Sequence, residues 1–547
     1  MAKDSLIKGT VILAAAALVA RFLGLIQKVP LQHILGDDGL ATYGIAYSVY
    51  SMLLIVATAG IPSALSKLVS ERYAIGSFGD AQRIYRAAVW FAVVTGVTSS
   101  LLLFVFAPAY ANGIAKDPHS SLAIRAIAPA LLIFPLIAIM RGYFQGRQVM
   151  KAGALSQIFE QIVRVTTAVG IACILMLHGQ PKETIAAGAS FGAVTGAVAA
   201  LIVMLVYQRS KNREDIREGL TPQAAGAAGA SPLGYKQIYR MLLLLSIPIS
   251  IISLAVPMVY FIDNSTVIGL LEGRIGAAEA KEQLGILTGK AQSLAGIPPI
   301  LAIALSTSVV PVVSSAYARQ DDAEVADKSS LALRIAVITG LPVVIALSVA
   351  AESVIGFLFR DAVGWEIASM LTATTMFQIV MMTSSSILMG LGQTMVPMLY
   401  VVAGIAVKLA GNMLLGPVFG MPGILMSTLI CFALIMGLNL CRLRRMVPYR
   451  ILGSRWPGVL LTGAVLTGTG IGLVLLFDHL SWISRPGRIG YLIEAGVIGS
   501  VILLLYPVCL FLFRAVLAED VERFPQPLRK VLAPFQRRFA GKKVQNM

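Results

Sequence analysis

The sequence predicts an all-α polytopic membrane protein, with about 14 transmembrane helices arranged as two six-helix lobes plus two C-terminal helices. Of the 547 residues, 57% are hydrophobic and only 13% are charged, whereas ordinary soluble domains carry about 25% charged residues. Apolar runs of about 20 residues recur along the whole chain, each long enough to cross the hydrocarbon core as a helix. The strand-length alternation of a membrane β-barrel is absent, so the helical class remains.

The apolar runs define the individual spans. The first is interrupted by Arg21 and the eighth is broken by Pro298 and Pro299. Read in order, the fourteen spans lie approximately at 6–32, 39–66, 87–111, 121–141, 155–178, 185–207, 238–262, 284–315, 331–351, 364–388, 395–416, 420–440, 457–477 and 489–513.

A long polar segment after span six divides the chain. It is charged at first and then rich in alanine and glycine, which is typical of a linker. Two local matches suggest that the flanking halves are a parallel repeat, since Gly146 matches Gly392 and Pro62 matches Pro311 at nearly equal offsets. The predicted divisions are an N-lobe at 1–207, a cytoplasmic linker at 208–237, a C-lobe at 238–443, spans thirteen and fourteen within 444–513, and a basic tail at 514–547.

The net charge of +17 follows from membrane topology. With the N-terminus in the cytoplasm, 31 of the 44 Lys and Arg residues fall in cytoplasmic segments and eight fall in external ones. The positive-inside rule predicts this asymmetry for an even number of spans with both termini cytoplasmic. The excess charge therefore indicates topology and attraction to anionic lipid headgroups, and nucleic acid is not an expected partner.

Signatures of catalysis and metal binding are absent from the sequence. It contains no Walker A motif, GxSxG elbow, HExxH motif or glycine-rich dinucleotide loop. The four cysteines lie in or beside apolar runs without a CxxC pair, and the four histidines are scattered. We therefore expect neither an enzyme nor a bound metal or cofactor.

Ionisable residues within spans are costly, so each is a candidate functional residue. The candidate set has five cations (Arg21, Lys28, Arg164, Lys290 and Lys408) and two acids (Glu160 and Asp263), so a cavity lined by them would be net positive and would suit a pyrophosphate. Lys28 and Lys290 have an alternative interpretation, in which they extend to the outer interface. The predicted pyrophosphate ligands are Arg21, Lys28, Lys290 and Lys408.

The remaining candidates have two interpretations each. Glu160 and Arg164 are spaced i,i+4 with the acid first, so they could be a structural pair in which the two charges neutralise each other. Alternatively, Glu160, Arg164 and Asp263 are gating or ion-coupling groups. Asp263 could instead cap a helix end. Polar residues that could contact a saccharide are Gln27, Tyr43, Tyr47 and Asn412, although tyrosines at this depth are also ordinary packing residues.

Several stretches resemble a known family, namely ARFLGLIQKV (20–29), the segment 43–71, MRGYFQG (140–146), SQIFEQIVRV (156–165) and KAQSLAGIP (290–298). They are similar to the polysaccharide and lipid II flippase group of the multidrug/oligosaccharidyl-lipid/polysaccharide (MOP) exporter superfamily, in its stage V sporulation protein B-like branch.

The resemblance implies two six-helix lobes around a central cavity, a lipid-tail groove formed by spans thirteen and fourteen, and a place in the bacterial cytoplasmic membrane. Arg21 and Lys290 match basic residues of the family. Relatives usually have arginine at the second position, and lysine lacks the planar fork for bidentate phosphate binding.

The predicted function is that of a flippase for a polyprenyl-pyrophosphate-linked saccharide, with lipid II for peptidoglycan synthesis as the leading substrate. It would work by alternating access coupled to an ion gradient or the membrane potential, with membrane lipids and a monovalent cation as further candidate partners. Three alternatives remain: a flippase for another lipid-linked glycan (teichoic acid, exopolysaccharide or spore-cortex precursor), a cation or drug antiporter of the same superfamily, and a membrane-embedded glycosyltransferase.

Overall fold

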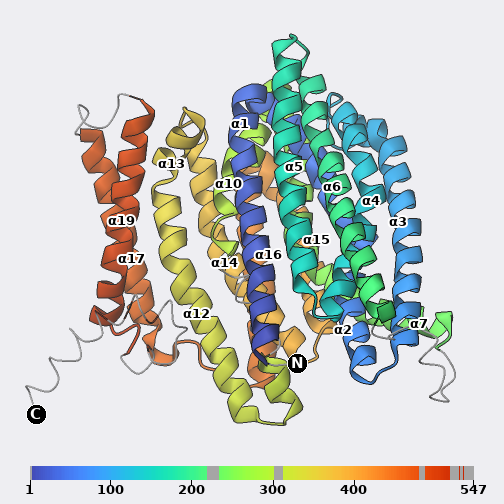
Figure 1. Cartoon of the computed structure of the whole chain (residues 1–547). Coiled ribbons are helices and arrows are strands. Elements are labelled where there is room, and N and C mark those ends of the chain that lie inside the picture. Colours follow the sequence, from blue (N-terminus) through green and yellow to red (C-terminus); the bar gives the residue numbers. More distant parts are fainter. Residues whose placement is uncertain are drawn as a thin grey trace, which may run out of the picture. The chain divides into compact units, whose positions relative to one another are not determined.

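The computed structural model is helical throughout the part of the chain that it describes (Figure 1). The described residues are 3–217, 233–300, 312–479 and 487–517, together with Val521, Arg529, Leu532 and Pro534. Two compact units share the chain. The first comprises Met1–Gly289 and Asn412–Gly420, and the second comprises Lys290–Gly411 and Met421–Met547.

The first unit is a bundle built around α4. In it, α4 packs against α3 and α6, and α5 packs against α6 and α1 (Figure 1). Its helices are α1 (Lys3–Thr58), α2 (Ile61–Ala74), α3 (Phe78–Gly113), α4 (Ser120–Gly146), α5 (Met150–Leu177), α6 (Lys182–Arg217), α7 (Tyr235–Ser253), α8 (Ala255–Ile275) and α9 (Ala277–Ile286).

Helix α3 has an exposed face that is apolar. Val94, Leu101 and Val105 recur at intervals of seven and four residues, so they share one face, and each is more than half exposed. A helix with such a face is stable only when another apolar phase covers it. The hydrocarbon of a bilayer provides this phase, so α3 is a lipid-facing helix.

Helix α1 contains the first predicted span and most of the second, whose last residues lie in α2. It is continuous except at Gly36, where φ is 67° and ψ is −176°. Only glycine adopts such a conformation without steric cost, so Gly36 allows a kink without ending the helix. Pro30 lies six residues earlier in the same helix.

Two small residues set the closest helix contacts of the first unit. A Cβ atom on Gly142 would lie 2.5 Å from the Pro62 carbonyl oxygen, so α4 approaches the start of α2 at backbone distance. A Cβ atom on Gly285 would lie 1.9 Å from the carbonyl oxygen of Asp37, so α9 packs equally closely on α1. Both contacts require the absence of a side chain.

The second unit has a core made by helices from both ends of its sequence. Helix α12 packs on α14 and α17, and α19 packs on α17 and α13 (Figure 1). Buried residues that join these helices include Ile338, Leu466, Ile502 and Leu510. Its helices are α10 (Gln292–Ala295), α12 (Asp322–Val349), α13 (Ala351–Phe359), α14 (Trp365–Gly390), α15 (Met395–Phe419, of which the last residues belong to the first unit), α16 (Met421–Met446), α17 (Trp456–His479) and α19 (Arg488–Leu512).

The described residues contain 12 helices that are long and apolar enough to cross a membrane, so the chain is a multi-pass membrane protein. The number differs from the predicted fourteen for two reasons. The first two predicted spans fall in one stretch, Leu18–Ala74. The eighth predicted span, 284–315, includes residues 301–311, which lie outside the described part, as do Pro311 and most of the predicted linker.

The seventh predicted span also differs from the structure. The sequence predicted one helix at 238–262, but the chain forms two, α7 and α8, which meet at Leu254. Asp263 was predicted at the end of that span and instead lies in the interior of α8, so the helix-cap interpretation of Asp263 is wrong.

Candidate functional site

Three tyrosines form a ladder along one face of α1. Tyr43, Tyr47 and Tyr50 are spaced by four and three residues, which places them on the same side of the helix. The rings of Tyr43 and Tyr47 are stacked with centroids 6.1 Å apart, and those of Tyr47 and Tyr50 lie 6.0 Å apart. The side-chain amide of Gln27, which is 3% exposed, donates to the Tyr43 hydroxyl at 3.2 Å. The predicted saccharide contacts Gln27, Tyr43 and Tyr47 are therefore neighbours.

Helix α5 places a guanidinium group on this ladder. The Cζ atom of Arg164 lies 4.9 Å from the centroid of the Tyr47 ring, which is the geometry of a cation–π contact. Arg164 is only 8% exposed. Among the described residues it has no ion-pair partner. The Tyr47 ring contacts its buried charge, and the Glu160 carboxylate, which is bonded to Arg141, adds electrostatic stabilisation from nearby.

Glu160 pairs with a different arginine from the one that the spacing suggested. Its Oε2 atom accepts from Nη2 of Arg141 at 2.8 Å. Arg141, at the end of α4, also donates to the Ser156 hydroxyl at 2.8 Å and 3.1 Å. The interpretation of Glu160 and Arg164 as a self-neutralised pair is therefore wrong, because the carboxylate is already engaged across the α4–α5 interface.

Sequence reasoning missed Arg141 as a member of this cluster. It counted Arg141 as a cytoplasmic topology charge, since the residue falls at the predicted end of span four. The one signal available was its place in the MRGYFQG stretch.

Lys28 lies on α1 next to Gln27 and contacts a π-helix. The five-residue π-helix Leu287–Ala291 follows α9. Such single-turn π-helices are rare and frequently mark functional sites. Lys28 donates to a carbonyl group of this π-helix, the backbone oxygen of Thr288, at 2.8 Å. In this conformation Lys28 is therefore bonded to the protein backbone.

Asp263 lies in a second polar cluster of the first unit and is 1% exposed. Its Oδ1 atom accepts from the side-chain amide of Asn412 at 2.9 Å, and the same amide donates to the Thr266 hydroxyl at 3.1 Å. Next to it, Asn264 donates to the backbone oxygen of Gly44 at 3.2 Å. The predicted gating acid and the predicted saccharide contact Asn412 are thus bonded to one another.

Lys290 belongs to the second unit and is completely buried. Its ammonium group donates to Oδ1 of Asp361 at 2.5 Å and to the backbone oxygen of Val363 at 3.3 Å. Burial excludes the interpretation in which Lys290 extends to the outer interface.

Lys408 is also completely buried, and it is surrounded by oxygen atoms of α16. It donates to the Ile424 carbonyl at 3.0 Å, the Ser427 hydroxyl at 2.9 Å and the Thr428 hydroxyl at 2.7 Å. Arg21 lies in α1, but its side chain is outside the part of the chain that the structure describes.

The family model that matches this sequence is described as "Polysaccharide biosynthesis protein" and covers residues 6–317, which is more than half of the chain. The chain belongs to this family. Its members are transporters of the MOP superfamily, which agrees with the family resemblance of the sequence.

Three relatives from Bacillus subtilis (strain 168) are similar over most of their length. The uncharacterized membrane protein YabM is 28% identical, with 80% of each chain covered. The lipid II flippase MurJ is 25% identical, with 85% of this chain and 87% of the relative covered. Stage V sporulation protein B is 29% identical, with 66% of this chain and 68% of the relative covered.

Solved structures share the fold. An inward-facing MATE family multidrug resistance transporter of the MOP superfamily aligns with a TM-score of 0.64 at 14% identity, and covers 80% of this chain and 97% of its own. A MOP superfamily transporter from Pyrococcus furiosus aligns with a TM-score of 0.57 at 14% identity, covering 81% of this chain and 96% of its own. The fold of this polysaccharide biosynthesis family member is therefore MATE-like.

Proposed function

We propose that this protein flips a polyprenyl-pyrophosphate-linked saccharide from the inner to the outer leaflet of the bacterial cytoplasmic membrane, with lipid II as the leading substrate. Family membership supports a role in polysaccharide biosynthesis, and a relative over most of the chain is a lipid II flippase. We further propose fourteen spans, two six-helix lobes and cytoplasmic termini.

The observation that carries the proposal is the buried Arg164. A guanidinium group without a paired carboxylate is costly to bury, so a protein retains one where it binds an anion. Arginine also matches phosphate oxygens with two parallel hydrogen bonds. We therefore assign Arg164 to the pyrophosphate, together with Arg21 and Lys28 of α1.

The aromatic ladder suits the saccharide end of the same substrate. Sugar rings present C–H faces that pack on aromatic rings, and their hydroxyls accept and donate hydrogen bonds. Tyr43, Tyr47 and Gln27 offer both properties beside Arg164. An exporter of cationic drugs would need the opposite charge, so we place the antiporter second to the flippase.

Lys290 and Lys408 join the proposal as groups that must exchange partners. In this conformation the ammonium of Lys290 is held by Asp361, and that of Lys408 by hydroxyl and carbonyl oxygens. To bind pyrophosphate, either lysine must first release these oxygens. Exchange of this kind provides an energetic link between substrate binding and a change of conformation, as alternating access requires.

We propose that Glu160 and Asp263 are gating or ion-coupling groups, and that a monovalent cation or the membrane potential supplies the energy. A negative charge moved outward from a negative interior gains about 2.3 kcal/mol per 100 mV. Each charge on a pyrophosphate would therefore favour outward transport.

Complementation tests the proposal. Cells depleted of their own lipid II flippase are supplied with this protein, and lipid II on the outer face is measured by a surface-accessibility assay. We expect growth and surface lipid II with the wild type, neither with Arg21→Ala at normal membrane abundance, and partial rescue with Arg21→Lys. If the wild-type protein fails to restore growth but exports another labelled polyprenyl-linked glycan normally, the result would favour a flippase for that glycan over one for lipid II.

A further inference from the structure

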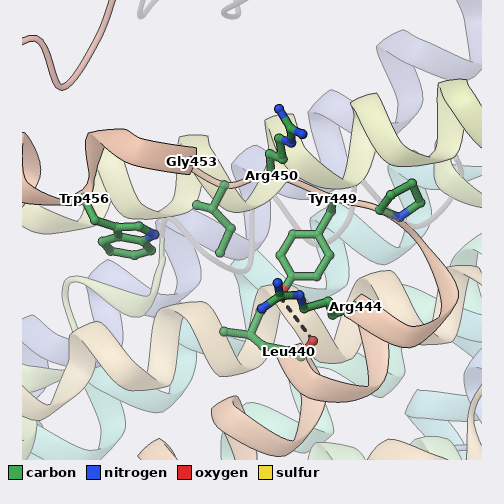
Figure 2. Close-up of a pocket in the computed structure, with 8 residues that line it drawn as sticks. Leu440, Arg444, Tyr449, Arg450, Gly453 and Trp456 are labelled. Carbon is green, nitrogen blue, oxygen red and sulfur yellow. Dashed lines mark hydrogen bonds between the residues drawn. The ribbon is translucent and has the colours of Figure 1, made fainter.

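A pocket of about 620 Å³ lies in the second unit, where the chain passes from α16 to α17. Its lining includes Leu440, Arg444, Tyr449, Arg450, Gly453 and Trp456 (Figure 2). None of these residues belongs to the proposed transport site. The pocket therefore needs an explanation of its own.

Hydrogen bonds to neighbouring helices hold the wall of the pocket in place. Arg334 of α12 donates to the backbone oxygen of Ile451 at 2.9 Å, and the backbone N–H of Arg450 donates to the Ser330 hydroxyl at 3.0 Å. The Tyr449 hydroxyl donates to the backbone oxygen of Leu440 at 3.1 Å, as the dashed line in Figure 2 marks. The segment between the two helices is thus hydrogen-bonded to both α12 and α16.

The pocket is strongly basic. Arg444 and Arg450 are exposed, and neither has an ion-pair partner among the described residues. The sequence contains no Asp or Glu between Glu366 and Asp478. Figure 2 shows Arg444 directed toward the hydroxyl end of Tyr449. Burial raises the pKa of Tyr449, so its hydroxyl stays neutral beside the guanidinium group.

The position of the pocket corresponds to a membrane–water interface. Helices α16 and α17 are both candidate membrane spans, ending at Met446 and beginning at Trp456, so the pocket lies at the level where they leave the bilayer. Trp456 is 42% exposed, and tryptophan and tyrosine favour the headgroup level. The first turn of α17 adds the partial positive charge of a helix N-terminus.

We propose that this pocket binds the phosphodiester headgroup of an anionic glycerophospholipid of the surrounding membrane. Arg444 would hold the phosphate beside the Tyr449 hydroxyl, and Arg450, which Figure 2 shows directed away from Arg444, would attract it through its charge. Leu440 with the Trp456 ring would contact the glycerol and the first methylenes of the acyl chains. The size supports a headgroup, because a pocket of this volume exceeds what a single ion would fill. The proposal does not depend on the transported substrate.

Lipid titration of the purified full-length protein tests this proposal. The delipidated protein in detergent is titrated with phosphatidylglycerol, with phosphatidylcholine and with inorganic phosphate, and bound lipid is counted by native mass spectrometry. The test variant carries Arg444→Gln and Arg450→Gln. The matched control is Arg445→Gln, which is compared with Arg444→Gln alone, because each removes one charge from the same exposed segment and only Arg444 lines the pocket.

We expect the wild type and the control to bind one phosphatidylglycerol with the same affinity. The double variant should bind it with an affinity lower by about tenfold or more. Replacement of both arginines by lysine should give an intermediate loss, which also keeps the test valid if the glutamine variant fails to fold. Equal loss in the control would overturn the proposal, since binding would then follow net charge alone. The proposal would also be overturned if phosphatidylcholine bound as tightly as phosphatidylglycerol, or if inorganic phosphate bound in place of the lipid.

Discussion

The bond between Arg141 and Glu160 makes a quantitative prediction about the cluster at α4, α5 and α1. The two side chains are 17% and 7% exposed, and their charged atoms lie 2.8 Å apart. At an effective dielectric constant of about 20, two unit charges at this distance attract by about 6 kcal/mol. Desolvation offsets part of this, and removal of one partner of a buried pair costs about 3–5 kcal/mol.

We therefore expect Glu160→Gln and Arg141→Gln each to lower the free energy of unfolding by about 3 kcal/mol. The double variant should be less destabilised than the sum of the two, with a coupling energy of about 1–3 kcal/mol. Arg164→Gln loses a cation–π contact worth about 1–2 kcal/mol, and its coupling to Glu160→Gln should be smaller.

Two measurements separate the roles. Unfolding of the purified variants in detergent gives the coupling energies, and the surface-accessibility assay for lipid II gives transport. We expect Arg164→Gln to remain folded and to lose flipping. A coupling of Glu160 to Arg164 as strong as that to Arg141 would refute the assignment of the ion pair, and an Arg164→Gln protein with full flipping would refute the assignment of Arg164 to the pyrophosphate.

Three further predictions concern packing, a buried charge and topology. Gly142→Ala should destabilise the protein by more than about 2 kcal/mol in thermal unfolding, because its methyl group would meet the backbone of Pro62, whereas Gly170→Ala, with open space around it, should be neutral or stabilising. Lys290→Met should change the free energy of unfolding by no more than about 1 kcal/mol, because Asp361, the carboxylate partner of Lys290, is 48% exposed. The same variant should abolish flipping in the surface-accessibility assay for lipid II. A cysteine at Ala225, which lies outside the described residues, should resist labelling by an impermeant reagent in intact cells, and labelling would contradict the fourteen-span topology.

The membrane class and most of the spans could be predicted because they depend on local composition. An apolar run of about 20 residues has few alternatives to a transmembrane helix, since every backbone group must be hydrogen-bonded within lipid. The kink at Gly36 and the break at Leu254 could not be predicted with the same certainty. Both depend on how the helix packs. The sequence around Leu254 is as apolar as the spans themselves, and the polar stretch around Gly36, QHILGDDG at 32–39, predicted a break between two spans and not a kink within one helix.

The candidate site was predicted less completely, because its contacts join distant parts of the chain. The i,i+4 spacing of Glu160 and Arg164 was correct for a shared helix face, but spacing cannot show whether a neighbouring helix offers a closer partner. Lys290 is bonded to Asp361, 71 residues away, and no periodicity connects them. Sequence patterns identify which charged residues are costly to bury, and only the fold shows which partner compensates each buried charge.

The buried cations differ in how their charge is compensated, and this difference orders their proposed roles. Arg141 has a buried carboxylate, so its charge contributes to structure and offers little to a substrate. Lys290 has a carboxylate that is half exposed, which water can solvate once the lysine leaves, so its release is less costly. Arg164 has no ion-pair partner among the described residues and contacts the Tyr47 ring, which stabilises a cation less than a paired anion would. An arriving pyrophosphate should therefore bind Arg164 in preference to Arg141, whose charge the buried carboxylate of Glu160 already compensates.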